Sequence, residues 1–338
     1  MNSAWVTSIL LISKVLSNKG CDRTNCTTLS SCPDLQKYVT NPARDNLKDV
    51  EGLICDIGED VQVCCDQKRI NNLTTVNVVY NNDTACGIQN EVYQFPWMVA
   101  FMAFGWSFCS GALLNERYVL TSASCATQDD VSKELFTLLL ADFNLKNNAC
   151  NHSITARVED CWQMQSFSIE EAIPHPLYNT TLNDVGLIRL NQSVTYTEYI
   201  QPICLPTKVS KWQPGNELYT SGFIVHFDQT IQREKFKRNT SIILKSLDEC
   251  REWYKKNGGA IPLNEFNFCS IDNPDIEAFD VNSFVDHGGP VVSMHNNQWY
   301  IEGVLSLAVD VRDDQRPIIN TNITYYLDWI YNNMRPWD

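Results

Sequence analysis

Fourteen cysteines, and above all their uneven spacing, limit what this chain of 338 residues can fold into. Six of them fall between Cys21 and Cys65, in a segment that has little apolar sequence of its own. A segment this short builds only a small hydrophobic core and needs covalent staples. It contains no histidine, which disfavours a zinc site as the alternative use of its cysteines. We therefore predict a disulfide-stapled module over residues 21–65, and spacing alone leaves its pairing open.

Three features of the sequence predict a secreted protein. Residues 1–17 have the length and apolar character of a signal peptide, although Lys14 interrupts the run; the alternative is a buried N-terminal strand or helix. The even number of cysteines fits an oxidising compartment. Asn-X-Ser/Thr triplets also fit, and carry less weight because they occur by chance. We expect N-glycosylation at Asn72, Asn82, Asn151, Asn179, Asn191 and Asn239; Asn25 and Asn322 also begin such triplets.

Composition excludes two classes of partner. The net charge is -14 with no block rich in lysine or arginine, so the chain lacks the electrostatic footprint of a nucleic-acid-binding protein. Apart from its first residues, no stretch approaches the length of about 20 apolar residues that spans a membrane. The apolar content of 44% is enough to fill a core, which indicates a globular protein.

Short strand-like runs dominate the chain from Cys86 to its end. Residues 66–85 are polar and are predicted to form a linker. After them come runs such as "WMVAFMAF", "GLIRL" and "WYIEGVLSLAV", separated by turn residues. This pattern is typical of an all-β barrel or sandwich. Only Thr324 to Met334 has helical spacing, and we expect a C-terminal helix there.

Several ordered motifs carry a resemblance to a known family. They are Phe95-Pro96-Trp97, "LTSASC", "HPLYNTTLNDVGLIRL", "IQPICLP" and "DHGGP". From Cys86 onward the chain resembles the chymotrypsin-like serine proteases, and with its N-terminal module it is similar to the clip-domain serine protease homologues of arthropods. The resemblance implies a clip domain over 21–65 and a protease-like domain over 86–338. The latter should comprise two six-stranded antiparallel β-barrels, with the site in the cleft between them.

The resemblance also implies a complete set of disulfides. All fourteen cysteines are used in it. The implied pairs are Cys21 with Cys64, Cys26 with Cys55, Cys32 with Cys65, Cys86 with Cys204, Cys109 with Cys125, Cys150 with Cys161, and Cys250 with Cys269.

The family's catalytic positions are changed in this sequence. Ser124 stands where the family has its histidine base, and His287 stands where it has its serine nucleophile. Only the carboxylate, Asp184, is retained. A triad needs a nucleophile, a base within hydrogen-bond reach and a carboxylate that orients the base. We therefore expect no functional catalytic residue.

The surroundings of the nucleophile are altered too. Val285 replaces the glycine of the oxyanion turn, and a β-branched residue resists the positive φ that such a turn needs. Val281 stands where trypsin-like members have aspartate. After Ser306 the pocket wall continues with Leu307 and Ala308, where the family has Trp-Gly. Recognition of arginine or lysine is not supported by these residues.

The signals for activation are absent as well. Active members are cut after a basic residue, and the new amino terminus pairs with the aspartate next to the nucleophile. Between Cys86 and Phe95 this chain has neither a basic residue nor an Ile-Val-Gly-Gly start, so Asp286 has no amine to meet. Arg44 and Arg69 are instead candidate processing sites, each as compatible with an ordinary solvated residue. No cofactor or metal is implied.

The resemblance leads to a hypothesis with three alternatives. We expect a secreted, non-catalytic cofactor or adaptor in an extracellular protease cascade, such as prophenoloxidase activation leading to melanisation. Its partners would be clip-domain proteases, prophenoloxidase or both. An endogenous or venom-type decoy that inhibits the cascade is the first alternative. A peptidase that uses an inverted pair of Ser124 and His287 is the second, and surface recognition of microbes or tissue is the third.

Overall fold

The protein was analysed as a computed structural model, which separates into two compact units, residues 1–78 with 335–338 and residues 79–334. The residues it describes are 26–40, 49–50, 52–57, 61–73, 86–89, 95–103, 106–127, 137–141, 164–206, 212–227, 233–257, 259–273, 287–308 and 316–335. None of the helices within these ranges is both long and apolar enough to cross a membrane.

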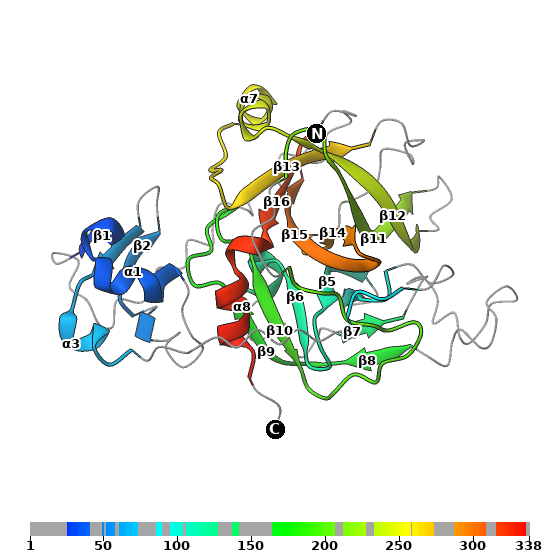
Figure 1. The fold of residues 1–338 in the computed structure, drawn as a ribbon, viewed down its shortest axis with the longest axis horizontal. Helices are drawn as coiled ribbons and strands as arrows, with labels where there is room; N and C mark the ends of the chain where they lie inside the picture. Colours follow the sequence, from blue (N-terminus) through cyan, green and yellow to red (C-terminus); the bar gives the residue numbers. More distant parts are fainter. Residues whose placement is uncertain are drawn as a thin grey trace, which may run out of the picture. The chain divides into compact units, whose positions relative to one another are not determined.

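The described part of the N-terminal unit contains a small sheet and helix α1. Strands β1 (Cys26–Thr28), β3 (Val61–Cys64) and β2 (Ile54–Ile57) form an antiparallel sheet in that order, and α1 spans Pro33–Thr40 (Figure 1). The predicted bridges Cys26–Cys55 and Cys32–Cys65 are present. Cys64 is also disulfide-bonded, and its predicted partner Cys21 lies outside the described residues. The core consists of fully buried side chains, among them Leu35, Val39, Leu53 and Val63.

A short helix extends this unit beyond its last cysteine. Helix α3 (Gln67–Ile70) is capped by Asp66, whose carboxylate accepts hydrogen bonds from the amides of Lys68 and Arg69. Ile70 and Leu73 are buried. The predicted linker, residues 66–85, therefore begins with an ordered helix, because two apolar residues at three-residue spacing follow a good N-cap.

The first barrel is a curled antiparallel sheet in the order β8-β7-β4-β5-β6-β10-β9. Its two end strands, β8 (Gln165–Phe167) and β9 (Ile169–Pro174), are consecutive in the chain and separated only by Ser168. Counted as one bent strand they close a six-stranded barrel, as the resemblance implied. The other strands are β4 (Met98–Ala103), β5 (Trp106–Leu113), β6 (Tyr118–Thr121), β7 (Thr137–Leu140) and β10 (Gly186–Leu190).

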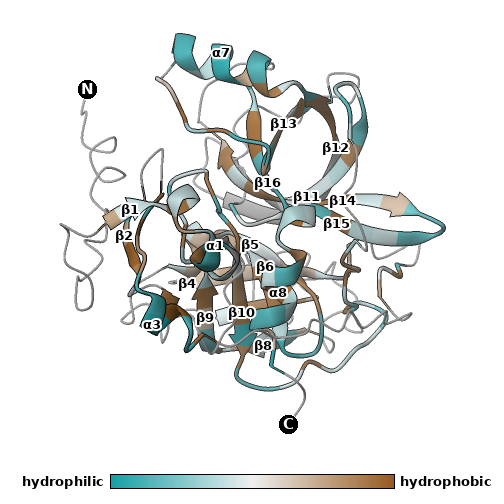
Figure 2. Ribbon diagram, turned by 60° about the vertical axis from the view of Figure 1, so that its left-hand side comes forward, coloured by the Kyte–Doolittle hydropathy of each residue, from teal (hydrophilic) through white to brown (hydrophobic). Residues whose placement is uncertain are grey.

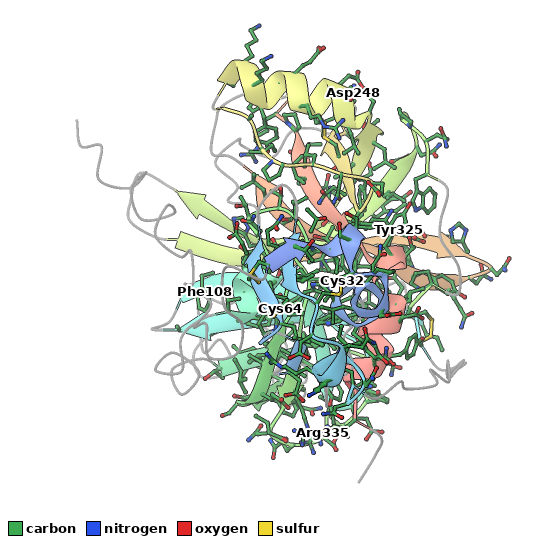
Figure 3. The ribbon with its side chains drawn as sticks, turned by 90° about the vertical axis from the view of Figure 1, so that its left-hand side faces the viewer. Cys32, Cys64, Phe108, Asp248, Tyr325 and Arg335 are labelled. Carbon is green, nitrogen blue, oxygen red and sulfur yellow. A yellow bond between two sulfur atoms is a disulfide. The ribbon has the colours of Figure 1, made fainter. Side chains whose placement is uncertain are left out.

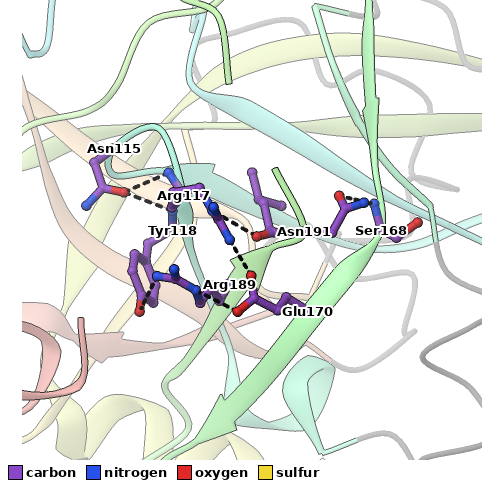
Figure 4. A network of polar contacts seen from close by, with 8 residues as sticks. Asn115, Arg117, Tyr118, Ser168, Glu170, Arg189 and Asn191 are labelled. Carbon is purple, nitrogen blue, oxygen red and sulfur yellow. Dashed lines mark hydrogen bonds and ion pairs between the residues drawn. The ribbon is translucent and has the colours of Figure 1, made fainter. Parts of the chain in front are cut away.

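Polar contacts hold the bend at Ser168 in place. Asn191 accepts the amide hydrogen of Ser168 through its side chain and donates its own backbone amide to the Ser168 carbonyl (Figure 4). Next to the bend, Glu170 of β9 forms ion pairs with Arg117 and with Arg189 of β10, whose Nε lies 2.9 Å from the carboxylate. The buried Arg189 side chain is thus neutralised, which a charge at this depth requires.

The second barrel is closed by six strands in the order β11-β12-β13-β16-β15-β14. Figure 2 shows hydrophobic residues along its strand β13 and along β9 and β10 of the first barrel. Val291 and Leu218 are among its fully buried residues. The strands are β11 (Glu217–Phe227), β12 (Arg233–Lys245), β13 (Asn267–Asp272), β14 (Pro290–His295), β15 (Gln298–Ala308) and β16 (Ile318–Asn322).

Two of the described helices that accompany the barrels are longer than five residues. The predicted C-terminal helix is confirmed as α8 (Leu327–Asn333), preceded by a 3-10 turn over Ile323–Tyr325, and its Trp329 packs 5.2 Å from the ring of His175. Helix α7 (Leu247–Asn257) was not predicted. Its signal is a capping box, in which Ser246 and Glu249 exchange hydrogen bonds, followed by buried residues at four-residue spacing.

Disulfides tie these elements together as expected. Cys109–Cys125, Cys250–Cys269 and Cys86–Cys204 are formed, whereas the implied Cys150–Cys161 pair lies outside the described residues. Exposed polar side chains cover the outside of α7, where Figure 3 labels Asp248.

Candidate functional site

Ser124 is placed by a short helix that leaves β6. Helix α4 (Ala123–Ala126) begins at Ser122, whose hydroxyl accepts the amide hydrogen of Cys125. Gly186 at the start of β10 lets this helix pack closely, because a Cβ there would lie 2.7 Å from the Cβ of Ala126. The first turn of α4 consequently points its free amides and the Ser124 hydroxyl at Asp184.

Asp184 is fully buried and surrounded by donors. Its Oδ1 accepts the amide hydrogen of Ser124 at 2.8 Å. Its Oδ2 accepts from the hydroxyl of Ser306 at 2.6 Å and, more weakly, from the hydroxyl of Ser124 at 3.4 Å. Burial nevertheless raises the pKa of Asp184 to about 6, and the bonds from Ser306, Ser124 and Ala123 offset only part of that effect.

Ser306 joins the carboxylate to the former nucleophile position. The register between β15 and β16 shifts between Leu305 and Leu307, so Ser306 sits at a β-bulge. Its hydroxyl donates to Asp184, while its carbonyl oxygen lies 2.8 Å from Nδ1 of His287. A carbonyl oxygen can only accept, so Nδ1 of His287 carries the proton in this contact.

The turn that carries His287 is anchored on both sides. The carbonyl of His287 accepts the amide hydrogen of Ser110, and the amide of Gly288 donates to Leu305. Gly288 has a φ of 81°, and a Cβ there would lie 2.1 Å from the Thr121 hydroxyl oxygen. The residue after His287 must therefore be glycine, as it is in the motif.

The arrangement lacks the hydrogen-bond chain of a serine protease. Among the described residues, no hydrogen bond joins His287 to Ser124 or to Asp184. The Ser124 hydroxyl contacts Ser122 at 2.8 Å and faces the carboxylate, with no imidazole to take its proton. The imidazole in turn donates to a backbone carbonyl. Serine and carboxylate alone provide a weak base and an unactivated nucleophile.

The segment in which active relatives would be cut is short and tethered. Cys86 is linked to Cys204, and Gly87 exchanges backbone hydrogen bonds with Pro202 and Trp299. The Gln89 side chain accepts from the amide of Phe95, which is itself buried. Residues 90–94, between Gln89 and Phe95, lie outside the described chain.

Several predicted site residues lie outside the described chain. Val281, Val285 and Asp286 are among them, as are Arg44, Asn82 and Asn151. Ala308, on the expected pocket wall, is half-buried and pairs with Ile318. No group of three or more metal-ligating side chains is found within the described ranges.

Processing and glycosylation candidates occupy varied environments. Arg69 lies inside α3 and donates to the carbonyl of Gly52, so the peptide bond after it is helical. Asn72 and Asn191 are exposed, whereas Asn179 is half-buried. Asn239 lies on β12.

Two neighbours of Ser124 were missed in the sequence. Ser122, two residues earlier, forms a hydrogen bond with Ser124 through their hydroxyls. Tyr178 lies beside both Ser124 and Asp184; burial, and then the negative charge of Asp184, raise the pKa of its phenol, while Ser124 lowers it. The repeated serines of "TSAS" hinted at the first contact, but nothing in the sequence separated Tyr178 from other tyrosines.

Comparison with known proteins places the chain. The family model described as Trypsin matches residues 85–330. The chain belongs to the trypsin family. This trypsin-family chain also shares its fold with neuropsin, a serine protease from mouse brain, at a TM-score of 0.53 and 22% identity, over 70% of this chain and 93% of neuropsin.

Relatives of this trypsin-family chain include proteins that carry a clip domain. Phenoloxidase-activating enzyme of Bombyx mori is 26% identical over 92% of this chain and 80% of its own length. Phenoloxidase-activating factor 3 of Holotrichia diomphalia is 26% identical over 98% of this chain and 99% of its own length. CLIP domain-containing serine protease B9 of Anopheles gambiae is 27% identical over 74% of this chain and 63% of its own length. With its N-terminal module, the chain is a clip-domain member of the trypsin family.

Proposed function

We propose that this protein is a secreted, non-catalytic regulator of an extracellular serine protease cascade. The observation that carries the proposal is the rewired site. Asp184 accepts hydrogen bonds from Ser124 and Ser306, and His287 donates to the carbonyl of Ser306. A carboxylate that accepts hydrogen bonds from hydroxyls and an amide does not orient a general base. An imidazole that donates to a backbone carbonyl does not activate a serine hydroxyl.

The names of relatives suggest which cascade is regulated. Two that cover nearly the whole chain are a phenoloxidase-activating enzyme and a phenoloxidase-activating factor, and a third, at 29% identity over 74% of this chain, is Melanization protease 1 of Drosophila melanogaster. We assign the chain to prophenoloxidase activation and melanisation, as a cofactor or adaptor. Its partners would be clip-domain proteases, prophenoloxidase or both.

The lack of catalysis is tested first by chemistry at the site. Purified protein should not react with an organophosphate at Ser124 and should leave a peptide library intact. The double variant Ser124→His/His287→Ser restores the residue types of a triad. It keeps Val285 and does not supply the new amino terminus that Asp286 would need. We expect its rate of activated-ester hydrolysis to exceed the rate in water by no more than about 10³- to 10⁴-fold. Ser124 labelling in the natural protein, with peptide cleavage, would overturn the proposal.

The regulatory role is tested in a reconstituted cascade. The protein is added to prophenoloxidase and an active clip-domain protease, and phenoloxidase output is measured together with the amino-terminal sequences of all chains. Raised output supports a cofactor, and a cut after Arg44 or Arg69 in the same tubes would identify a processed one. Lowered output with an intact chain would instead establish the decoy. Unchanged output over a range of concentrations contradicts both.

A further inference from the structure

Helix α7 ends in a pair of lysines with free side chains. Lys255 and Lys256 are both exposed on its last turn. Within the described chain, neither side chain forms a hydrogen bond or an ion pair. Figure 1 shows the helix on the outside of the second barrel. The pair is therefore accessible to an enzyme that recognises a basic side chain.

Two other pairs of adjacent basic residues occur in the sequence, and the fold restrains both. The pair at 68–69 lies within α3, where Arg69 donates to a backbone carbonyl and the next residue, Ile70, is buried. The pair at 237–238 lies within β12, whose backbone is paired there with β11. Cleavage at either pair first requires a packed helix or a strand ladder to open. The pair at the end of α7 has neither restraint.

The residues that follow the lysines are small or polar and exposed. Asn257, Gly259 and Ala260 all face solvent. Gly259 ends the helix by donating its amide to the carbonyl of Tyr254. It has a φ of 118°, and a Cβ there would meet nothing within 4 Å. Exposed segments of this composition are the preferred places of proteolytic nicking.

The end of α7 can open without disturbing the packed part of the helix. Tyr254 is the last buried residue of α7. Beyond it, the helix end is held by the bond from Gly259 and by an exposed bond from the Asn257 side chain to the carbonyl of Trp253. Helix ends held by exposed hydrogen bonds fray at little cost in free energy. The bond between Lys256 and Asn257 is therefore presented on the least stable turn of α7.

A disulfide would keep the products of a cut together. The bond between residues 256 and 257 lies inside the loop that Cys250 and Cys269 close. Cys269 is the only cysteine after residue 256 in the sequence. The carbonyl of Leu263 also accepts a hydrogen bond from Arg251 of α7 at 2.9 Å, so the segment beyond the cut stays attached to the helix. Cleavage would thus give two chains joined by one covalent link.

We propose that the peptide bond between Lys256 and Asn257 is a processing site for a trypsin-like protease, whose pocket takes a basic side chain. Water is the second reactant. The amide bond is hydrolysed, Lys256 acquires a free carboxylate and Asn257 a free amine. The cut is read from the chain itself and the proposed function from phenoloxidase output, so each can fail without the other.

The test treats the full-length natural protein with an active trypsin-like clip-domain protease and follows cleavage by electrophoresis with and without reduction. We expect a fragment with the amino-terminal sequence "NGGA", which separates only after reduction. It should form at least about tenfold faster than the product of a cut after Arg69 in the same samples, because opening α3 also removes Ile70 from its packing. This arm requires no variant to fold.

Two matched variants assign the cut. Lys255→Gln/Lys256→Gln removes both charges, keeps good helix formers and should abolish the fragment. The control Lys68→Gln/Arg69→Gln makes the equivalent change on α3 and should leave the rate of cleavage after Lys256 within about twofold of the natural rate. Complete cleavage elsewhere with this bond intact would overturn the proposal. So would a fragment that persists in the first variant, or one that separates without reduction.

Discussion

Replacing Asp184 by asparagine should change how the stability of the protein depends on pH. The carboxyl is fully buried, and its pKa is raised from 3.8 to about 6, first by burial. The folded state therefore holds this proton more tightly than the unfolded state does. The stability from protonation is fully present below about pH 4 and is lost as pH rises through about 6. The pKa difference corresponds to about 3 kcal/mol in the free energy of unfolding.

Urea unfolding of oxidised protein, followed by tryptophan fluorescence between about pH 4 and pH 8, measures this effect. Many carboxyls titrate in this range, so the informative quantity is the natural protein minus the variant Asp184→Asn at each pH. We expect that difference to fall by about 3 kcal/mol from the acidic to the neutral end, with most of the change between about pH 4 and pH 6.5. The natural protein should therefore become less stable relative to the variant as pH rises.

A control at the surface isolates the effect of burial. The variant Asp248→Asn makes the same chemical change on α7, where the Asp248 side chain is 87% exposed beside Arg251. Its difference from the natural protein should stay within about 1 kcal/mol over the whole range. If the curves of the natural protein and Asp184→Asn run parallel, Asp184 ionises freely in the folded state and our account of its environment is wrong.

Two further predictions concern the frame of the site and the clip module. The variant Gly288→Ala should lower the free energy of unfolding by about 2 to 4 kcal/mol, because its Cβ would clash with Thr121. Gly215→Ala, at a similar positive φ with open space around it, should lower it by only about 1 kcal/mol. Equal losses would show that backbone strain alone decides the cost. Asp66→Ala removes the cap of α3 and, at about 1 kcal/mol, should raise the rate of limited cleavage by trypsin after Arg69 about fivefold; an unchanged rate would show that helix opening does not limit cleavage.

The two-barrel fold could be predicted because its signals are local. Runs of alternating and apolar residues predicted an all-β domain, and the resemblance carried by the ordered motifs implied the arrangement in two barrels. The bend at Ser168 could not be found in this way. Whether one bent strand pairs with both ends of a sheet depends on contacts between residues far apart in the chain, such as Leu138 with Phe167 and Leu190 with Ile169. Helix α7 had a readable capping box, but its short length and charged outer face obscured the signal.

The site was predictable in its parts and only partly in its connections. The exchange of residue types at Ser124 and His287 could be read directly, and so could the retention of Asp184. The bond from His287 to the carbonyl of Ser306 could not, because it depends on a β-bulge that turns this carbonyl out of the ladder with β16. A side chain's reach is set by its type, but its partner is set by the backbone around it.

The presence of Asp184 has an explanation that requires no catalysis. Its carboxylate accepts the Ser124 amide at the start of α4 and the hydroxyl of Ser306, and burial leaves these donors no water as a substitute. The Asp184 backbone carbonyl also accepts from the hydroxyl of Thr321 on the second barrel. An apolar residue here would leave several donors unpaired at once, at a cost of about 1 to 3 kcal/mol each. A buried triad aspartate therefore indicates how these elements are held together, whereas a working protease is indicated by the imidazole that such an aspartate would orient.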